Sequence, residues 1–412
     1  MEKFQKFKKR KSLQHFFKFT VIKPKISLKF TWKMKSAIED FINSLFKSVD
    51  IQVNGSGDAD IQIHNPEFYK RVIRDGALGF GESYMDGWWD VKNLDELIYR
   101  VLRASLQQKV RPLKNIELLW SVLFINIGKK SKAFEVGERH YDLGNELFQK
   151  MLDKRMIYSC GYWEDAENLD DAQEAKLDLI CRKLNLKAGM KVLDIGCGWG
   201  GFCKYAAEKY QVEVIGITVS KEQAEYAIED CKGLTVKFKL QDYRDLDAEE
   251  LLDNGNFFDR IVSVGMFEHV GYKNYKTFMT IANKLLKDDG LFLLHSIGNN
   301  ISVVKNDPWS EKYVFPNSHL PSIKQIGGAV ENLFVVEDFH NFGAYYDKTL
   351  MAWFQNFDMN WNELKSTYDE RFYRMWKYYL LSSAGSFRAR NVQLWQLVLS
   401  KKGVLKGYQS IR

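Results

Sequence analysis

Short apolar runs alternate with helical patterns through the second half of the chain. Four runs have the length of buried strands: residues 191–195, 213–218, 258–264 and 291–295. Three stretches with helical periodicity lie between them: residues 202–209, 221–230 and 274–286. Strands that alternate with helices of this length predict an α/β fold with a doubly wound parallel sheet.

The region before this unit has a different pattern. Two alternating runs predict short strands and two periodic stretches predict helices: residues 51–53, 61–63, 67–74 and 94–106. Residues 79–89, GFGESYMDGWW, are too rich in glycine and aromatic side chains for an ordinary helix, so we interpret them as a binding loop or a packed connection. These patterns predict a small mixed α+β domain over residues 48–127 and a larger α/β domain over residues 128–412.

A basic segment precedes both domains. Up to Lys47 the chain has thirteen Lys or Arg and three acidic residues, a net charge of +10, whereas the remaining residues sum to −3. Phenylalanine, tryptophan and isoleucine are interleaved with these lysines. Residues 1–47 therefore form either a solvated, disordered arm or a contact with an anionic membrane surface, where each lysine contributes about 1 kcal/mol. Nucleic acid would also satisfy the charge.

The cysteines and the hydropathy indicate the cellular compartment in which the protein is expected. The five cysteines include no C-x-x-C pair, which argues against a disulfide framework or a zinc site, and no metal is expected. No apolar run approaches the roughly 20 residues of a membrane span. No uninterrupted apolar segment follows the lysine-rich start, so a secretory signal is not expected. We expect a cytoplasmic protein that meets membranes from one side.

The first predicted strand of the larger domain runs directly into a glycine-rich loop, DIGCGWGG, at residues 194–201. Glycines allow the backbone to turn sharply and to approach a ligand closely at the start of the next helix. Gly196, Gly198 and Gly201 also satisfy G-x-G-x-x-G. A nicotinamide dehydrogenase and an S-adenosylmethionine-dependent methyltransferase are therefore both to be considered.

Two features favour the methyltransferase. A dinucleotide site uses an acidic residue at the end of the second strand to hold the ribose hydroxyls, whereas that strand here ends in GITVSKEQ. Asp194 precedes the first glycine, where it can brace a loop that receives a cationic sulfonium nucleotide. Asp242 follows the next apolar stretch and can accept from an adenine amino group. The alternative is that Asp194 and Asp242 are only turn or capping residues.

The glycine loop belongs to a series of eight motifs that follow one another along the chain. They are HYDLGNELF (140–148), YSCGYW (158–163), LDIGCGWGG (193–201), QDYRD (241–245), VSVGMFEHVG (262–271), FLLHSIG (292–298), HNFGAYYDKTLMAW (340–353) and FRARNVQLWQ (387–396). In this combination the chain resembles bacterial cyclopropane-fatty-acyl-phospholipid synthases and, more distantly, mycolic acid cyclopropane synthases. The resemblance implies a Rossmann-like methyltransferase that adds the methyl carbon of S-adenosylmethionine to the cis double bond of an unsaturated phospholipid acyl chain and closes a cyclopropane.

The resemblance also implies the site residues. Family members bind a bicarbonate ion that is taken to be the base, and its pocket corresponds to Cys160, Glu268, His295, Ile297 and Tyr346. Cofactor contacts correspond to Tyr158, Ser159, Gly196, Gly198, Thr218, Gln223, Gln241 and Asp242, to which the loop argument adds Asp194. Glu268 can orient an anion only if a proton is shared between them, so one of the two pKa values should be raised. Taken singly, Cys160 and Tyr346 would be interpreted as core residues.

The substrate path and the partners follow from the same resemblance. We expect the acyl chain to lie against aromatic residues around Phe342, Tyr345, Trp353 and residues 372–380. The implied partners are a phospholipid membrane with unsaturated acyl chains, contacted peripherally from its inner face, and a second copy in a homodimer.

Three alternatives remain open. The nearest is another S-adenosylmethionine-dependent lipid or small-molecule methyltransferase. A catalytically silent lipid-binding protein would not require the intact glycine loop. An RNA methyltransferase could use the basic arm, but the chain shows no recognised RNA-binding module, so no nucleic acid is expected.

Overall fold

The computed structural model describes residues 28–106, 144–247, 257–303 and 307–412. A seven-stranded sheet forms the larger domain, in the order β5-β4-β3-β6-β7-β9-β8. Its strands are β3 (Lys191–Ile195), β4 (Glu213–Thr218), β5 (Val236–Leu240), β6 (Phe258–Val264), β7 (Leu286–Asn299), β8 (Val335–Asn341) and β9 (Val392–Ser400). The first five strands in this order pair in parallel, and β9 pairs antiparallel with both β7 and β8.

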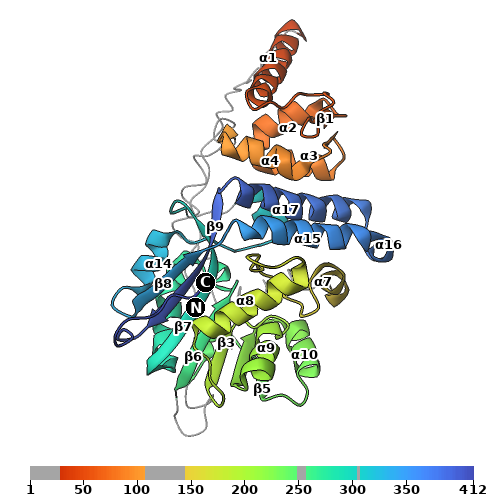
Figure 1. Cartoon of the computed structure of the whole chain (residues 1–412). Helices are drawn as coiled ribbons and strands as arrows, with labels where there is room; N and C mark the ends of the chain where they lie inside the picture. The colour runs from red at the N-terminus through yellow and green to blue at the C-terminus, as the bar shows by residue number, and fades with distance from the viewer. Residues whose placement is uncertain (1–27, 107–143, 248–256, 304–306) are drawn as a thin grey trace, which may run out of the picture.

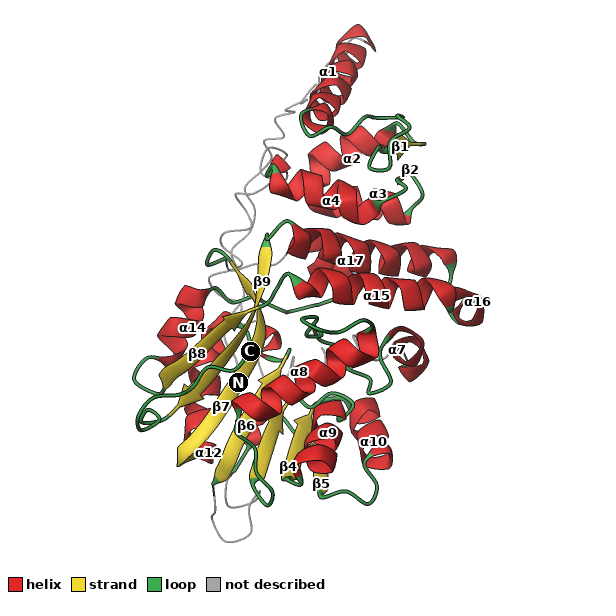
Figure 2. Ribbon diagram, in the orientation of Figure 1, coloured by secondary structure: helices red, strands yellow, loops and turns green. Residues whose placement is uncertain are grey.

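Both faces of the sheet are covered by helices, as Figure 2 shows. Val192, Val214 and Val262 pack in one cluster with apolar residues of α8 (Leu169–Lys183) and α9 (Gly201–Tyr210). Leu193 and Ile195 turn to the other face, where they pack with α12 (Tyr275–Leu285) and α14 (Ile323–Val330). Alternate residues of β3 therefore pack on opposite faces of the sheet, and the predicted doubly wound α/β fold is confirmed. The antiparallel strands β8 and β9 extend the sheet in a way that the sequence analysis did not predict.

The predicted elements agree closely with the structure in this domain. The strands expected at 191–195, 213–218 and 258–264 are β3, β4 and β6, and the helix expected at 221–230 is α10 (Lys221–Asp230). Strand β7 is longer than the expected 291–295. The short η3 (Phe267–His269) and η4 (Tyr272–Asn274) follow β6.

In the described residues, the N-terminal unit has four helices and a two-stranded antiparallel sheet. Its elements are α1 (Leu28–Lys47), β1 (Gln62–Ile63), α2 (Glu67–Asp75), α3 (Ala77–Met85), β2 (Trp89–Asp90) and α4 (Leu94–Arg103). Residues 51–53 are not a strand, since Val53 forms only an isolated bridge with Ile61.

The interpretation of residues 79–89 as a loop or connection was wrong, because most of this segment is helix α3. Its glycines serve close packing. A Cβ on Gly79 would lie 2.5 Å from the carbonyl oxygen of Arg71, and one on Gly81 would lie 2.5 Å from the Trp309 ring. Tertiary packing thus overrides the low helix propensity of glycine here.

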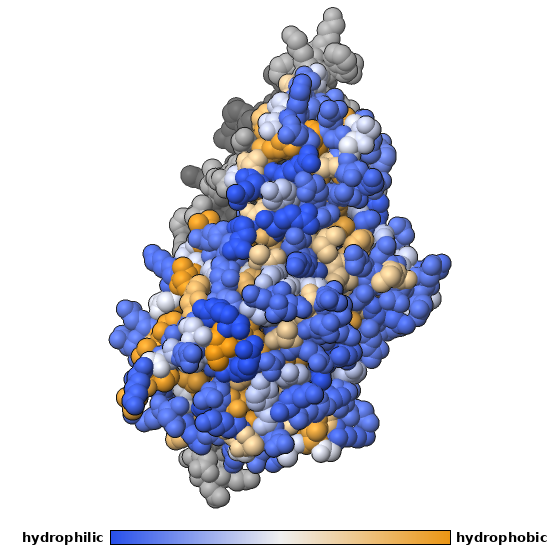
Figure 3. Space-filling view, viewed as in Figure 1, coloured by the Kyte–Doolittle hydropathy of each residue, from blue (hydrophilic) through white to orange (hydrophobic). Residues whose placement is uncertain are grey.

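The basic arm expected over residues 1–47 divides at Leu28. Helix α1 occupies Leu28–Lys47, and its Ile42 and Phe46 are buried in the core. Residues 1–27 lie outside the described residues, as does the expected domain boundary at residue 127. Among the residues that the structure describes, no helix is long and apolar enough to cross a membrane. Figure 3 shows a largely hydrophilic face with scattered apolar patches.

A layer of helices lies between the N-terminal unit and the sheet (Figure 1). Its main helices are α15 (Tyr345–Met359) and α17 (Glu370–Arg388). Helices α7 (Asn145–Met151) and α16 (Trp361–Leu364) contact α15, and α13 (Pro308–Tyr313) contacts α3. Helix α17 packs directly on α4 at Gly385, where a Cβ would lie 2.4 Å from the carbonyl oxygen of Asp95 and 3.1 Å from the Cβ of Ile98. Glycine at this position allows the two backbones to approach.

We expect Gly385→Ala to lower the free energy of unfolding by about 1–3 kcal/mol, because the added methyl group has to push α4 away from α17. Gly327→Ala in α14 is the matched control, since a Cβ there meets nothing within 4 Å. That variant should gain about 0.5–1 kcal/mol from the better helix propensity of alanine. Urea denaturation measures both changes, and equal effects of the two variants would contradict the packing argument.

Candidate active site

The glycine loop follows β3 and begins α9. Gly196, Gly198 and Gly200 have positive φ angles of 86°, 56° and 84°, a region that favours glycine. A Cβ on Gly201, the first residue of α9, would lie 2.4 Å from the carbonyl oxygen of Arg155. The loop therefore turns tightly against its surroundings and keeps its backbone close to the cavity beside it.

A cavity of about 180 Å³ lies along this loop and the carboxyl ends of the neighbouring strands. All nine predicted cofactor residues line it: Tyr158, Ser159, Asp194, Gly196, Gly198, Thr218, Gln223, Gln241 and Asp242. The Thr218 hydroxyl at the end of β4 donates to Gln223 Oε1 at 2.8 Å, which joins that strand to α10. This is the usual place for a nucleotide in an open α/β sheet.

Two carboxylates face this cavity in different surroundings. Asp194 is 2% exposed, accepts from the Cys203 thiol at 3.3 Å, and burial raises its pKa to about 7. Asp242 is held by Arg244, with Nε donating to Oδ1 at 2.8 Å and Nη2 to Oδ2 at 2.6 Å. A nearby cation would favour the ionised form of Asp194, as a sulfonium nucleotide requires. Asp242 keeps lone pairs for an adenine donor.

A second cavity of about 480 Å³ adjoins the first. Tyr158, Ser159, Gly265 and His269 line both. Four of the five predicted catalytic residues line the second cavity: Glu268, His295, Ile297 and Tyr346. The structure therefore places the residues expected for an anion next to those expected for the methyl donor.

Glu268 and His295 present unpartnered polar atoms to this region. Glu268 Oε1 accepts from the Ile297 N–H at 2.6 Å, whereas its Oε2 has no hydrogen-bond partner among the described residues. Burial raises the pKa of Glu268 to about 7, despite the Ile297 hydrogen bond. His295 Nε2 likewise has no partner in the described part of the chain, and burial lowers the pKa of the imidazole well below 6.5.

Cys160 is placed differently from the other predicted catalytic residues. It is fully buried and does not line the second cavity. Its thiol donates to the carbonyl oxygen of Gly161 at 3.2 Å and lies 3.8 Å from the Thr349 hydroxyl of α15. Burial raises the thiol pKa, so the sulfur is a packed, protonated group. Its neighbour Ser159 lines both cavities instead.

Three polar residues of the site were missed by the sequence analysis. Lys176 of α8 lines the first cavity and donates to Ser159 Oγ at 2.8 Å, and burial lowers its pKa to about 8. His269 lines both cavities. Gln396 of β9 places its Nε2 3.2 Å from His295 Nδ1. Lys176 could have been found from the sequence, because it lies on the same helical face as the apolar Ala172 and Ile180, where a lysine is unusual.

The aromatic wall differs in part from the expectation. Tyr378 and Tyr379 of α17 line the second cavity, within the expected 372–380 segment. Phe342 and Trp353 are buried in the main core and do not line it. Tyr379 lies with its hydroxyl 2.8 Å from that of Tyr158, which joins α17 to the wall between the two cavities.

Comparisons with known proteins agree on one family. The model of the mycolic acid cyclopropane synthetase family matches residues 128–397. The cyclopropane-fatty-acyl-phospholipid synthase of Escherichia coli K12 is 52% identical over 371 residues, which cover 90% of this chain and 95% of that protein. Cyclopropane mycolic acid synthase 1 of Mycobacterium tuberculosis H37Rv is 35% identical over 64% of this chain and 96% of its own length.

A solved structure of a mycolic acid cyclopropane synthase, CmaA1 complexed with SAH and CTAB, has a TM-score of 0.59 and 32% identity. The matched region covers 65% of this chain and 98% of the CmaA1 chain. The fold and the sequence therefore point to the same group of enzymes.

We expect His295 to be neutral at physiological pH with its proton on Nε2, because the Gln396 amide donates to Nδ1. The lowered pKa means that the folded state resists protonation, so His295 reduces stability only as the pH falls below 6.5, where the unfolded imidazole is protonated. Nitrogen NMR of histidine-labelled protein measures the tautomer, and His295→Gln assigns the signal. A proton on Nδ1 would contradict this prediction, whereas Gln396→Leu should mix the two tautomers.

Proposed function

The chain belongs to the mycolic acid cyclopropane synthetase family, and we propose that it converts the cis double bond of an unsaturated phospholipid acyl chain to a cyclopropane. It is an S-adenosylmethionine-dependent methyltransferase, and family membership supports cyclopropanation of a lipid. The phospholipid substrate is proposed because the Escherichia coli relative named for that activity matches over 90% of the chain.

One observation carries the proposal: the cofactor cavity and the larger cavity meet at Tyr158, Ser159, Gly265 and His269. S-adenosylmethionine supplies an electrophilic methyl carbon, and a proton later leaves that carbon as the ring closes. An alkene is a weak nucleophile, so its reaction depends on close alignment with the methyl group. Two contiguous cavities that share part of their walls provide such alignment.

The walls also suit a reaction that develops positive charge in a hydrocarbon. Tyr346 packs on Phe387 with ring centroids 4.5 Å apart, and both line the larger cavity beside Tyr158. Aromatic faces stabilise a nearby cation without forming a bond to it. Buried surroundings exclude the water that would otherwise trap the cation as an alcohol.

We further propose that Glu268 and His295 hold bicarbonate, which would supply the base for the departing proton. The fit rests on two buried polar atoms without partners in the described part of the chain, Glu268 Oε2 and His295 Nε2. With its proton on Nε2, His295 donates to an anion. Glu268 has a pKa raised to about 7, so it can share a proton with an anion at neutral pH instead of repelling it.

The test is mass spectrometry of unsaturated phospholipid vesicles incubated with the protein and methyl-labelled S-adenosylmethionine. We expect the lipid to gain one labelled methylene while its olefinic signal is lost. A methyl or hydroxymethyl product would overturn the cyclopropane assignment, and an unchanged lipid would overturn the phospholipid substrate.

Glu268→Gln should lower turnover by about a hundredfold to ten-thousandfold, the usual range for a lost acid–base group. Binding of S-adenosylhomocysteine should change little, because the glutamine oxygen can still accept from the Ile297 N–H. Calorimetry measures the affinity, and product formation measures turnover.

Gly201→Ala should have the contrasting effect, a loss of cofactor affinity. Its added Cβ would lie 2.4 Å from the carbonyl oxygen of Arg155, so the affinity for S-adenosylhomocysteine should fall. If Glu268→Gln lost affinity as strongly as turnover, its assignment to proton transfer would be incorrect.

We propose that the protein works peripherally on the inner face of a membrane, and the basic N-terminal residues support this. Residues 1–27 contain nine Lys or Arg and one acidic residue. Removal of these residues leaves α1 in place and should weaken binding to anionic vesicles in a salt-sensitive way. Vesicle co-sedimentation checks this, with zwitterionic vesicles as the control. Binding that is unchanged at low salt would contradict a membrane role for this segment.

The homodimer stays an expectation from the resemblance, and sedimentation equilibrium tests it. The division into domains at residues 47 and 127 is likewise a proposal. The buried Ile42 and Phe46 of α1 support the assignment of residues 28–47 to the N-terminal domain.

A further inference from the structure

The larger cavity extends well beyond the catalytic residues into the N-terminal unit. Its far part, which we call the apolar lobe, is lined by Ile42 and Phe46 of α1, Phe80 of α3, and Ile98, Val101 and Leu102 of α4. Ile42, Phe46 and Ile98 are buried. The volume of about 480 Å³ falls within the roughly 300–1,000 Å³ of sites that bind small molecules.

The apolar lobe is continuous with the catalytic part of the cavity along α17. Tyr346 contacts Phe387 at the end of this helix, and Ser382 and Ser386 line the cavity farther along it. Gly385, on the same helix, packs against Ile98. Helix α17 lies between the N-terminal helices and the sheet in Figure 1, so a ligand that enters the lobe passes along α17 from the reacting centre.

The two parts of the cavity differ in polarity. Every residue that the described part of the N-terminal unit contributes to the lining is apolar or glycine. The polar lining residues, which include Asn299, Asp307, Ser310 and Asn391, all come from the larger domain. An ester or a head group buried in the apolar lobe would lose its hydrogen bonds to water without replacement, whereas a hydrocarbon would not.

We infer that the apolar lobe binds the methyl-terminal segment of the acyl chain and thereby measures the distance from the double bond to the chain end. This rests on the proposed cyclopropanation of phospholipids and adds a selectivity element to it. The lobe lies outside residues 128–397, the part of the chain that matches the family model. Selection of the double bond is therefore assigned to α1, α3 and α4, and the chemistry to the larger domain.

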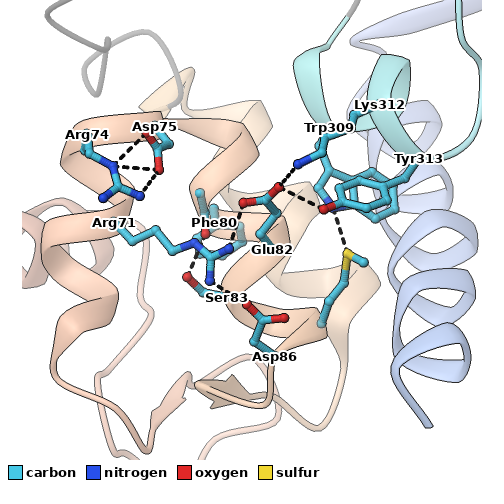
Figure 4. A network of polar contacts seen from close by, with 12 residues as sticks. Arg71, Arg74, Asp75, Phe80, Glu82, Ser83, Asp86, Trp309, Lys312 and Tyr313 are labelled. Atoms are coloured by element: carbon cyan, nitrogen blue, oxygen red, sulfur yellow. Dashed lines mark hydrogen bonds and ion pairs between the residues drawn. The ribbon is translucent and has the colours of Figure 1, made fainter. Parts of the chain in front are cut away.

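A partly buried network of ion pairs and hydrogen bonds holds this wall in place, as Figure 4 shows. Glu82 of α3 accepts from Arg71 Nη2 at 2.7 Å, from Lys312 Nζ at 2.6 Å and from the Tyr313 hydroxyl at 2.8 Å. Burial alone would raise the pKa of Glu82, but these hydrogen bonds hold it at about 2. The network ties α3 to α13, whose Trp309 lines the same cavity, so the lobe has the fixed wall that a length measurement requires.

Three phospholipids that differ only in their acyl chain test the inference. Palmitoleoyl and vaccenoyl chains have the same length beyond the double bond, and an oleoyl chain is two carbons longer there. Palmitoleoyl and oleoyl chains have the same length between ester and double bond, and a vaccenoyl chain is two carbons longer there. Vesicles that contain all three lipids, sampled at low conversion, give ratios that do not depend on how much of a variant is folded.

Val101→Trp fills part of the lobe and should lower conversion of oleoyl relative to palmitoleoyl chains by about tenfold or more, the usual effect of misfit methylene groups in a pocket. The vaccenoyl to palmitoleoyl ratio should stay near that of the wild type. Val101→Ala enlarges the lobe and should shift the oleoyl ratio in the opposite direction. Ala104→Trp places the same indole ring at an exposed position next to the end of α4 and should leave both ratios unchanged.

A selective loss of vaccenoyl conversion in Val101→Trp would overturn the inference, because it would place the carboxyl side of the chain in the lobe. Ratios equal to those of Ala104→Trp would overturn it as well. These results are distinct from failure of the proposed function, in which the wild-type protein would convert none of the three lipids.

Discussion

The active site depends on the parallel register of β3, β4 and β6, which brings their carboxyl ends to one edge of the sheet. The glycine loop after β3, Thr218 at the end of β4 and Glu268 just beyond β6 all lie at this edge. A nucleotide and a hydrocarbon can therefore occupy adjoining cavities, although the residues that line them are far apart in the sequence. The antiparallel strand β9 extends the same edge by placing Gln396 opposite His295.

Burial shapes the electrostatics of this edge in a consistent way. It raises the pKa values of Asp194 and Glu268 to about 7 and lowers that of Lys176 to about 8. In each case the charged form is disfavoured because the site has little water to solvate it. A sulfonium cation near Asp194 would favour the charged form of that carboxylate. A charged ligand would thus offset the free-energy cost of burying an ionised side chain.

Much of this could be predicted from the sequence, because local patterns determine it. The strands β3, β4 and β6 follow from apolar runs. The nine predicted cofactor residues line one cavity, but most of them were identified through the family resemblance and not through a local pattern. Tertiary contacts determine the remainder. Helix α3 forms despite its glycines because Gly79 and Gly81 admit close neighbours. Gln396 matters only through a cross-strand partner 101 residues away, and Cys160 is turned toward Thr349 by packing against α15.

The arrangement of the chain separates the steps of recognition. The part that matches the family model contains every predicted catalytic residue, whereas α1, α3 and α4 lie before it. The two parts meet at the face of α17, which packs on α4 at Gly385 and lines the cavity at Ser382 and Ser386. They also meet where Glu82 of α3 bonds Lys312 and Tyr313 of α13. A change in the N-terminal helices can therefore alter which acyl chain fits without moving Glu268 or His295. Close packing at Gly385 and the Glu82 hydrogen bonds hold the two units together. A cavity built between two units retains its length only while those units stay in contact.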